Sequence, residues 1–191
     1  MLTLISPAKS LDLESPTPAH HAIVPRLLDQ TAKLAEIMSS KSVTELRKLM
    51  NVSEEIATLN VERYRDFQPG TPVNARPAGV TFDGAVYRGM NPHSFTTRDW
   101  TEAQKTLRIL SGLYGVLRPL DRIQPYRLEM GTPLHTDRGT TVANWWSDRI
   151  LNLVAADLQE SPGPKTTVNL ASAEYFQAID GIDARVISPR F

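Results

Sequence analysis

The chain has 191 residues, and its 21 basic and 21 acidic side chains give a formal net charge of zero. The hydrophobic content of 41% and the charged content of 22% are ordinary for a globular protein, and the length suits a single domain with a substantial core. Since the chain has no cysteine, disulfide bonds, thiol catalysis and cysteine-ligated zinc or iron–sulfur centres are excluded. Since the charge is balanced, nucleic acid can be bound only by a local basic patch.

The N-terminus predicts a short buried strand. Leu2, Leu4 and Ile5 are followed at once by Ser6-Pro7, which ends the apolar run. The run is too short for a signal peptide, and no stretch of the sequence approaches the ~18 apolar residues that a membrane span needs. We therefore expect a cytoplasmic protein.

Lys9 lies directly after this strand. Open α/β sheets bind ligands at the ends of buried strands, so Lys9 is a candidate for holding phosphate or carboxylate. The alternative, which this fragment alone favours, is a solvated surface lysine. Residues 12–25 are rich in Pro, His and Ser and are predicted to form a loop.

Helices are predicted next. Residues 26–38 place apolar side chains at helical spacing. Ser42 and Glu45 form a capping box that starts a second helix, and Ser53 caps a third, whose first turn carries two glutamates. We interpret this region as scaffold, because its acidic residues oppose the binding of a polyanion.

The middle of the chain is punctuated by loops. Residues 68–78 carry three prolines and predict a loop. The elements expected after it are a strand over 80–87 with a hairpin turn at Asp83-Gly84, a helix from Thr97 through Leu110 to Gly112, and a strand over 126–130.

Residues 142–158 show the strongest helical pattern of the chain. Trp145 and Trp146 lie on its apolar face, so we interpret them as core; a stacking platform for nucleic-acid bases is the minority interpretation. The elements predicted after it are a strand over 167–170, a helix capped by Ser172, and a strand over 186–188. The pattern stops at Phe191 without a closing element.

Positive charge is concentrated between residues 105 and 130. We call this segment the basic stretch; its cations are Lys105, Arg108, Arg118, Arg122 and Arg127, set against Asp121 and Glu129. A bend interrupts it at Ser111-Gly112-Leu113-Tyr114-Gly115. Glycines let backbone N–H groups approach a phosphate, and neighbouring arginines can hold it. The alternative is an ordinary helix C-cap followed by solvated arginines.

This bend is similar to the glycine hairpin of a helix-hairpin-helix DNA-binding module. In that module one hydrophobic residue separates the glycines, whereas here Leu113 and Tyr114 do so. Pro119 also limits the helix that would follow, because proline is tolerated only in a first turn.

A second arrangement of polar residues lies at predicted strand ends. It is a pocket formed by Lys9, Tyr114, Arg127, Glu129, Asn169, Ser172 and Tyr175, which could bind a small anion or perform acid–base chemistry. The four histidines form no metal-binding pattern, and the sequence has no P-loop, dinucleotide fingerprint or nucleophile elbow. We therefore predict no catalytic residue, no metal site and no cofactor.

Four blocks of sequence resemble the YaaA peroxide-stress protein family. They are Ser6–Lys9, residues 82–89, the run from Leu107 to Gly131, and residues 168–176. The resemblance implies a mixed α/β fold of unusual topology that forms one domain over residues 1–191. It also implies a cytosolic bacterial protein induced by hydrogen peroxide, linked to low unincorporated iron, with a helix-hairpin-helix in a positive DNA-binding cleft. Family members continue beyond the position of Phe191 with a basic segment, so we expect this chain to be C-terminally truncated.

The sequence favours two functions. The first is binding of double-stranded DNA without sequence preference, through Lys9, Lys105, Arg108, Ser111, Gly112, Leu113, Tyr114, Gly115, Arg118, Arg122 and Arg127. The second is an enzyme acting on a small anionic or nucleotide-like ligand in the same cleft. Direct binding of iron is the least favoured interpretation, because Asp and Glu do not cluster in the sequence.

Overall fold

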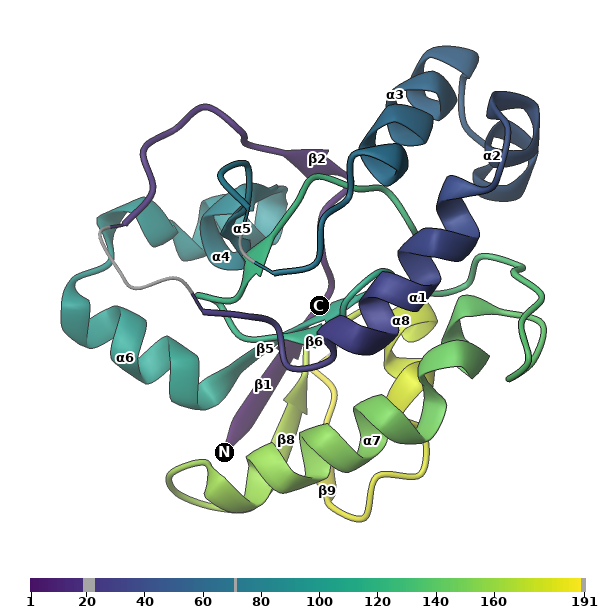
Figure 1. The fold of residues 1–191 in the computed structure, drawn as a ribbon. Helices are drawn as coiled ribbons and strands as arrows, with labels where there is room; N and C mark the ends of the chain where they lie inside the picture. The colour runs from purple at the N-terminus through teal and green to yellow at the C-terminus, as the bar shows by residue number, and fades with distance from the viewer. Residues whose placement is uncertain (19–22, 71, 190–191) are drawn as a thin grey trace.

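A five-stranded mixed sheet lies at the centre of the computed structural model, which describes residues 1–18, 23–70 and 72–189 (Figure 1). The strand order is β6-β5-β1-β8-β9. The strands are β1 (Leu2–Ile5), β5 (Leu107–Ser111), β6 (Gly115–Leu117), β8 (Thr166–Asn169) and β9 (Arg185–Ile187). β1 pairs in parallel with β5 and β8, β8 pairs in parallel with β9, and β6 runs antiparallel to β5. The predicted mixed α+β fold is confirmed.

The predicted first strand occupies the middle of the sheet. Thr3 pairs with Leu107 of β5 on one side and with Val168 of β8 on the other. Leu2 and Leu4 are completely buried, as expected of a parallel strand that is covered on both faces. β1 is therefore the strand on which the rest of the sheet is built.

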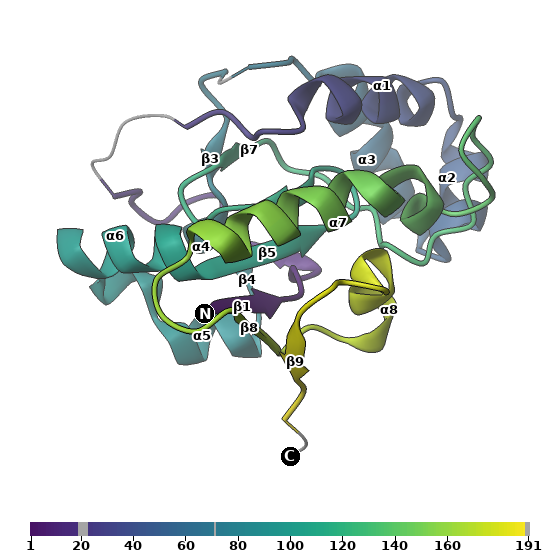
Figure 2. The same ribbon diagram turned by 90° about the horizontal axis from the view of Figure 1, so that it is seen from below.

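Helices and short strand pairs surround this sheet (Figures 1 and 2). The helices are α1 (Leu28–Ser39), α2 (Val43–Met50), α3 (Glu54–Arg65), α4 (Ala78–Thr81), α5 (Ala85–Met90), α6 (Thr97–Thr106), α7 (Val142–Glu160) and α8 (Ala173–Phe176). The 3-10 turns are η1 (Pro92–Ser94) and η2 (Gln177–Ile179). The short pairs are β2 (Ser10–Leu11) with β4 (Phe82–Asp83), and β3 (Arg76–Pro77) with β7 (Arg122–Ile123). In the described part of the chain, no helix combines the length and the apolar character needed to cross a bilayer.

The predicted helix starts over residues 42–53 are confirmed. The Ser42 hydroxyl accepts from the Glu45 N–H at 3.3 Å, and the Glu45 carboxylate accepts from the Ser42 N–H at 2.8 Å. The Ser53 hydroxyl accepts from the Ile56 N–H at 3.3 Å. α2 and α3 lie beside each other at one end of the molecule in both views (Figures 1 and 2).

The tryptophan pair of α7 belongs to the core, as predicted. Trp145 is 4% exposed and Trp146 is fully buried. The Trp146 indole N–H donates to the Gly112 carbonyl at 2.7 Å, which ties α7 to the bend after β5. Ser147 has a φ of 27°, so α7 is kinked there, and the sequence pattern did not predict this kink.

The helix predicted from Thr97 to Gly112 is wrong in its second half. α6 ends at Thr106, and residues 107–111 form β5. Residues 108–111 are all buried, because β1 and β6 flank this strand. Pairing with β1, which is distant in sequence, therefore overrides the helical spacing of the apolar residues.

The strand predicted over residues 80–87 is also wrong. Two short helices, α4 and α5, occupy this segment, and only Phe82–Asp83 form a strand. Asp83-Gly84 is not a hairpin turn, because Gly84 is the N-cap of α5 and has an extended backbone.

Two other predictions concern residues near strand ends, and the first of them is wrong. Residues 126–130 form no strand; their carbonyls are used elsewhere, Arg127 O by the Tyr64 hydroxyl and Met130 O by the Ala143 N–H. Ser172 is the N-cap of α8, as predicted, although its side chain makes no capping bond. The predicted loop over 12–25 is irregular where it is described, whereas its residues 19–22, with His20 and His21, and the chain end at Phe191 lie outside the described residues.

Candidate functional site

The glycine bend lies inside the protein. It joins β5 to β6, so it is the turn of a β-hairpin, and the predicted helix-hairpin-helix at this position is wrong. Residues 111–115 are all buried. Their polar groups are used internally: the Ser111 hydroxyl contacts the Tyr126 hydroxyl at 2.6 Å and accepts from the Tyr114 N–H at 2.9 Å. These amides therefore have no access to a DNA phosphate.

Cations of the basic stretch are divided between separate places. Lys105, Arg108 and Arg118 line a surface cavity of about 220 Å³ together with Arg26. Arg122 is half-buried elsewhere and donates to the Ala75 carbonyl at 2.9 Å. The cations of the basic stretch, residues 105–130, thus do not all lie at one place.

Acidic side chains neutralise arginines of the cavity that Arg108 and Arg118 line. Asp157 accepts from Arg26 at 2.6 Å and from Arg108 at 2.6 Å, and it is 3% exposed. Burial opposes the charged form of Asp157, but the hydrogen bonds from the two arginines outweigh burial and lower the pKa of this carboxyl. Arg118 pairs with buried Asp121 at 3.0 Å. We interpret these contacts as structural, because they join the segment before α1, β5 and α7.

Lys9 and Arg127 lie at a second place, a pocket of about 220 Å³. We call it the switch-point pocket; it is lined by Ser6, Pro7, Ala8, Lys9, Tyr126, Arg127, Leu128, Glu129, Ser172, Glu174 and Tyr175. Ser6–Lys9 follow the carboxyl end of β1, and residues 172–175 follow that of β8.

Sheet topology explains why a pocket forms there. The chain leaves β1 toward β5 on one side and leaves β8 toward β9 on the other. Neighbouring parallel strands whose connections diverge in this way leave a crevice beyond their carboxyl ends, which is where open sheets bind ligands. The Ser6 hydroxyl accepts from the Ser172 N–H at 2.9 Å and holds the two loops together.

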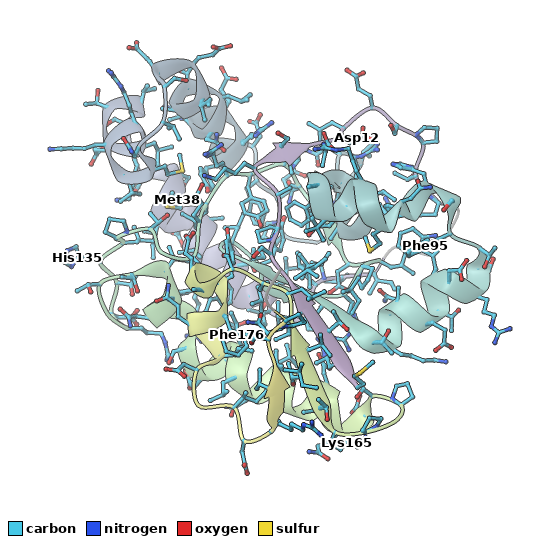
Figure 3. All side chains as sticks on the ribbon, turned by 180° about the vertical axis from the view of Figure 1, so that it is seen from behind. Asp12, Met38, Phe95, His135, Lys165 and Phe176 are labelled. Carbon is cyan, nitrogen blue, oxygen red and sulfur yellow. The ribbon has the colours of Figure 1, made fainter. Side chains whose placement is uncertain are left out.

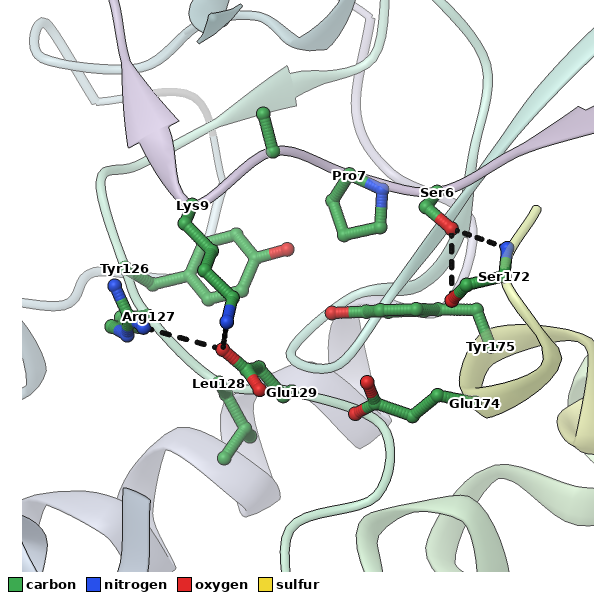
Figure 4. A pocket seen from close by; sticks show the side chains of 11 residues that line it. Ser6, Pro7, Lys9, Tyr126, Arg127, Leu128, Glu129, Ser172, Glu174 and Tyr175 are labelled. Carbon is green, nitrogen blue, oxygen red and sulfur yellow. Dashed lines mark hydrogen bonds and ion pairs between the residues drawn. The ribbon is translucent and has the colours of Figure 1, made fainter. Parts of the chain in front are cut away.

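Charged side chains converge inside the pocket (Figure 4). The Lys9 ammonium lies 3.2 Å from Glu129 Oε1, and the Arg127 guanidinium lies 3.3 Å from the same oxygen. Tyr175 points its hydroxyl into the pocket between Pro7 and Glu129 (Figure 4). Burial raises the pKa of this phenol, so it stays protonated and can donate a hydrogen bond.

The structure brings together five of the seven residues predicted for the alternative pocket: Lys9, Arg127, Glu129, Ser172 and Tyr175. Tyr114 is in the core, with its hydroxyl accepting from the Gln124 N–H at 2.9 Å, and Asn169 is not part of the lining. Ser6 and Glu174 were missed. Their positions beside Lys9 and Ser172, directly after predicted strands, were the signal that could have found them.

The histidines that the structure describes lie far apart. His93 approaches Asp12, with 3.8 Å between its Nε2 and the carboxylate, whereas His135 is exposed on the opposite side of the molecule (Figure 3). Among residues 1–18, 23–70 and 72–189, no three His, Asp or Glu side chains are grouped so that they could hold a metal ion.

Comparison with known proteins identifies the family. The sequence profile described as "Peroxide stress protein YaaA" matches residues 1–191. The chain belongs to this family. A UPF0246 protein of Idiomarina loihiensis is 46% identical over 194 residues, which cover 100% of this chain and 75% of the relative. UPF0246 proteins of Alteromonas mediterranea (45% identical, 74% of its length) and Burkholderia thailandensis (42%, 75%) also match the whole chain.

The sequence blocks that resemble the YaaA family meet at the switch-point pocket. Three of them, Ser6–Lys9, the run to Gly131 and residues 168–176, contribute its lining. The fourth, residues 82–89, supports it from behind: the Tyr87 hydroxyl donates to the Ser6 carbonyl at 2.9 Å, and the Phe82 ring packs against Tyr126. Residues far apart in the sequence therefore build one site.

A helical hairpin is present at a position that the sequence analysis assigned to scaffold. We call residues 43–65 the α2–α3 hairpin: two short helices joined by Asn51, Val52 and Ser53. Asn51 has a φ of 50°, in the left-handed region, and its N–H donates to the Arg47 carbonyl, which ends α2. Ser53 and the two following glutamates are exposed, so the amino end of α3 is open to solvent.

The α2–α3 hairpin is connected to the switch-point pocket. Tyr64, near the end of α3, is buried, and its hydroxyl donates to the Arg127 carbonyl at 2.8 Å. Arg127 lines the pocket. This hydrogen bond therefore ties α3 to the segment that carries Arg127 and Glu129.

Proposed function

We propose that this cytoplasmic YaaA-family protein protects the cell during peroxide stress by binding double-stranded DNA without reading its sequence. The family membership supports the stress-protective role. The observation that carries DNA binding is the α2–α3 hairpin, which has the two short helices and the tight turn of a helix-hairpin-helix element. The amino end of α3 is exposed, and its helix dipole favours a phosphate there, against the Ser53 hydroxyl, which already accepts from the Ile56 N–H, and against the two glutamates of the first turn.

The charges around the hairpin set the expected strength of binding. Arg47 and Lys48 lie exposed in the last turn of α2, beside the turn. Glu54 stands 3.9 Å from Arg47 and offsets part of this charge. We therefore expect weak, salt-sensitive binding, with log K falling by about 3 per tenfold increase in salt if three or four phosphates are contacted.

The other cations that the sequence predicted to bind DNA can contribute only where they are exposed. Lys9 and Lys105 have 70% and 52% of their side chains exposed, whereas Arg108 has 6%. Limiting iron-driven damage to DNA, which the resemblance implies, remains part of the proposal as an indirect result of binding.

Fluorescence anisotropy with a labelled duplex tests this proposal. Replacing both Arg47→Gln and Lys48→Gln is expected to weaken binding at least tenfold at low salt and to reduce the slope of log K against log salt by about 2. Lys33→Gln is the matched control, because Lys33 is an exposed lysine of α1 outside the hairpin. Affinity of the double variant within twofold of the unsubstituted protein would show that the hairpin is not the contact surface.

A second function is favoured by the switch-point pocket, which is a concave site at the ends of parallel strands. It is binding or conversion of a small anionic or nucleotide-like ligand held by Lys9 and Arg127. A thermal-shift screen with nucleotides and phosphorylated metabolites tests it. Stabilisation by several degrees with one ligand, and none with duplex DNA, would favour this function over DNA binding.

A further inference from the structure

The charges of the switch-point pocket are balanced. Lys9 and Arg127 are its cations, and both contact the same oxygen of Glu129. Glu174 adds a second carboxylate, one oxygen of which accepts from the Gly131 N–H at 2.9 Å. A phosphate or carboxylate entering this pocket would have to displace Glu129 from both cations and would then face two carboxylates. The pocket is thus poorly suited to a free anion.

The walls of the pocket are apolar and partly flat. Pro7, Ala8 and Leu128 line it, together with the rings of Tyr126 and Tyr175. Figure 4 shows the Tyr175 ring edge-on below Pro7, with its hydroxyl directed toward Lys9 and Glu129. Tyrosine and proline surfaces of this kind are suited to a planar ring, since nucleobases stack on aromatic side chains in many proteins.

The volume of the pocket and its hydrogen-bonding groups further limit the kind of ligand that it can bind. A cavity of about 220 Å³ is smaller than the ~300–1,000 Å³ of sites for drug-sized ligands, so it has room for one compact ring system. Donors are supplied by the Lys9 ammonium and the Tyr175 hydroxyl, and acceptors by the Glu129 carboxylate. The Nε of Arg127 is a buried donor for which the described residues supply no partner.

We propose that the switch-point pocket binds a nucleobase, an uncharged heteroaromatic ring with adjacent donor and acceptor groups on its edge. The ring packs between Pro7 and Tyr175, and its edge bonds to Lys9 and Glu129. The proposal rests on the second function given above and replaces its anionic ligand by the base of a nucleotide. The base comes either from a free nucleoside or from an unpaired nucleotide of a DNA strand, which enzymes extrude into pockets of this type.

Isothermal titration with free nucleosides tests the first source. One or more of the common nucleosides are expected to bind, whereas ribose 5-phosphate and inorganic phosphate, which lack the base, do not. Lys9→Met and Glu129→Gln are each expected to weaken nucleoside binding at least tenfold, and the control Lys33→Met to leave it within twofold. Equal binding of ribose 5-phosphate, or unchanged affinity in Glu129→Gln, would overturn the proposal.

A duplex carrying one unpaired 2-aminopurine tests the second source. Entry of this base into the pocket is expected to change its fluorescence, and the change should be lost in Glu129→Gln. Tyr175→Phe, which keeps the ring and removes the hydroxyl, should retain part of the signal. If neither free nucleosides nor the unpaired base bind, the proposal fails. Its failure is distinguishable from that of DNA binding, because fully paired duplex is measured separately and its affinity is expected to be unchanged in Glu129→Gln.

Discussion

Replacing Gly112 by alanine tests whether the bend at residues 111–115 is buried. An added Cβ would lie 2.7 Å from the carbonyl carbon of Leu128 and closer still to its oxygen. The obstacle is backbone, so it cannot rotate away as a flexible side chain would. The Gly112 carbonyl also accepts from the Trp146 indole at 2.7 Å, so a shift of the bend to relieve the clash would strain that bond.

The expected cost follows from this geometry. Overpacking a well-packed interior costs about 1–3 kcal/mol, and a fixed backbone obstacle places Gly112→Ala at the upper end, about 3 kcal/mol. For a domain of this size, that corresponds to a fall of about 6–12 °C in melting temperature. Urea unfolding followed by tryptophan fluorescence measures the free energy, with an unchanged m-value showing that only stability has changed.

Gly89→Ala is the matched control. Gly89 is an exposed residue of α5, and a Cβ there would meet nothing within 4 Å. Alanine should stabilise this helix by about 0.5–1 kcal/mol. A melting temperature for Gly112→Ala equal to that of the unsubstituted protein, together with weakened DNA binding, would refute the buried bend and restore an exposed phosphate-binding turn.

Two further predictions concern ionisable groups. Asp157→Asn should lower the free energy of unfolding by about 3–5 kcal/mol in urea titrations, because two largely buried arginines lose their anion. Folding lowers the pKa of Asp157, so this carboxylate stabilises the protein fully above its ordinary pKa of 3.8, and the stabilisation is lost as the pH falls through the lowered pKa of the folded state. The stability of Asp157→Asn should therefore fall less in acid than that of the unsubstituted protein. An equal loss of stability in acid would contradict the assignment. Burial raises the pKa of all five tyrosines above 10.0, so stability should fall as the pH rises above 10, where the unfolded chain releases protons first. Tyrosinate absorbance should then rise in one step together with the loss of circular dichroism; a gradual rise centred on pH 10 in the folded protein would contradict it.

Local sequence patterns were sufficient to predict the elements whose structure depends on neighbouring residues. The capping box of α2, the N-cap of α3, the apolar stripe of α7 and the burial of its tryptophans were all predictable, because each depends on residues within a few positions of one another. The strand β1 was predictable because a short apolar run that ends at Ser6-Pro7 has few alternatives.

Segments whose structure depends on distant partners were mispredicted. Leu107–Ser111 has helical spacing of its apolar residues, but its pairing with β1 decides that it is a strand. The same dependence misled the interpretation of the basic stretch. Arg108 looked like a phosphate ligand because its partner, Asp157, lies 49 residues further along the chain.

The candidate site was predictable only in part. Lys9 and Ser172 were found because both follow predicted strands, and the rule that parallel strands share a carboxyl edge places such residues together. Arg127 and Glu129 were included for their chemistry, although the strand predicted for them does not form. That Glu129 neutralises both cations could not be read from spacing, since the contact depends on where the segment after β7 crosses the ends of β1 and β8.

The central position of β1 has a consequence for synthesis of the protein. Its partners, residues 107–109 and 167–169, are made long after it. A ribosome adding about 5–20 residues per second needs roughly 8–30 s to pass from the first strand to the last of these partners. Both hydrogen-bonding edges of the N-terminal strand lack a partner until residues 107–109 are made, and the edge that faces β8 lacks one until residues 167–169 follow, so this strand of the nascent chain is exposed to wrong pairing during synthesis.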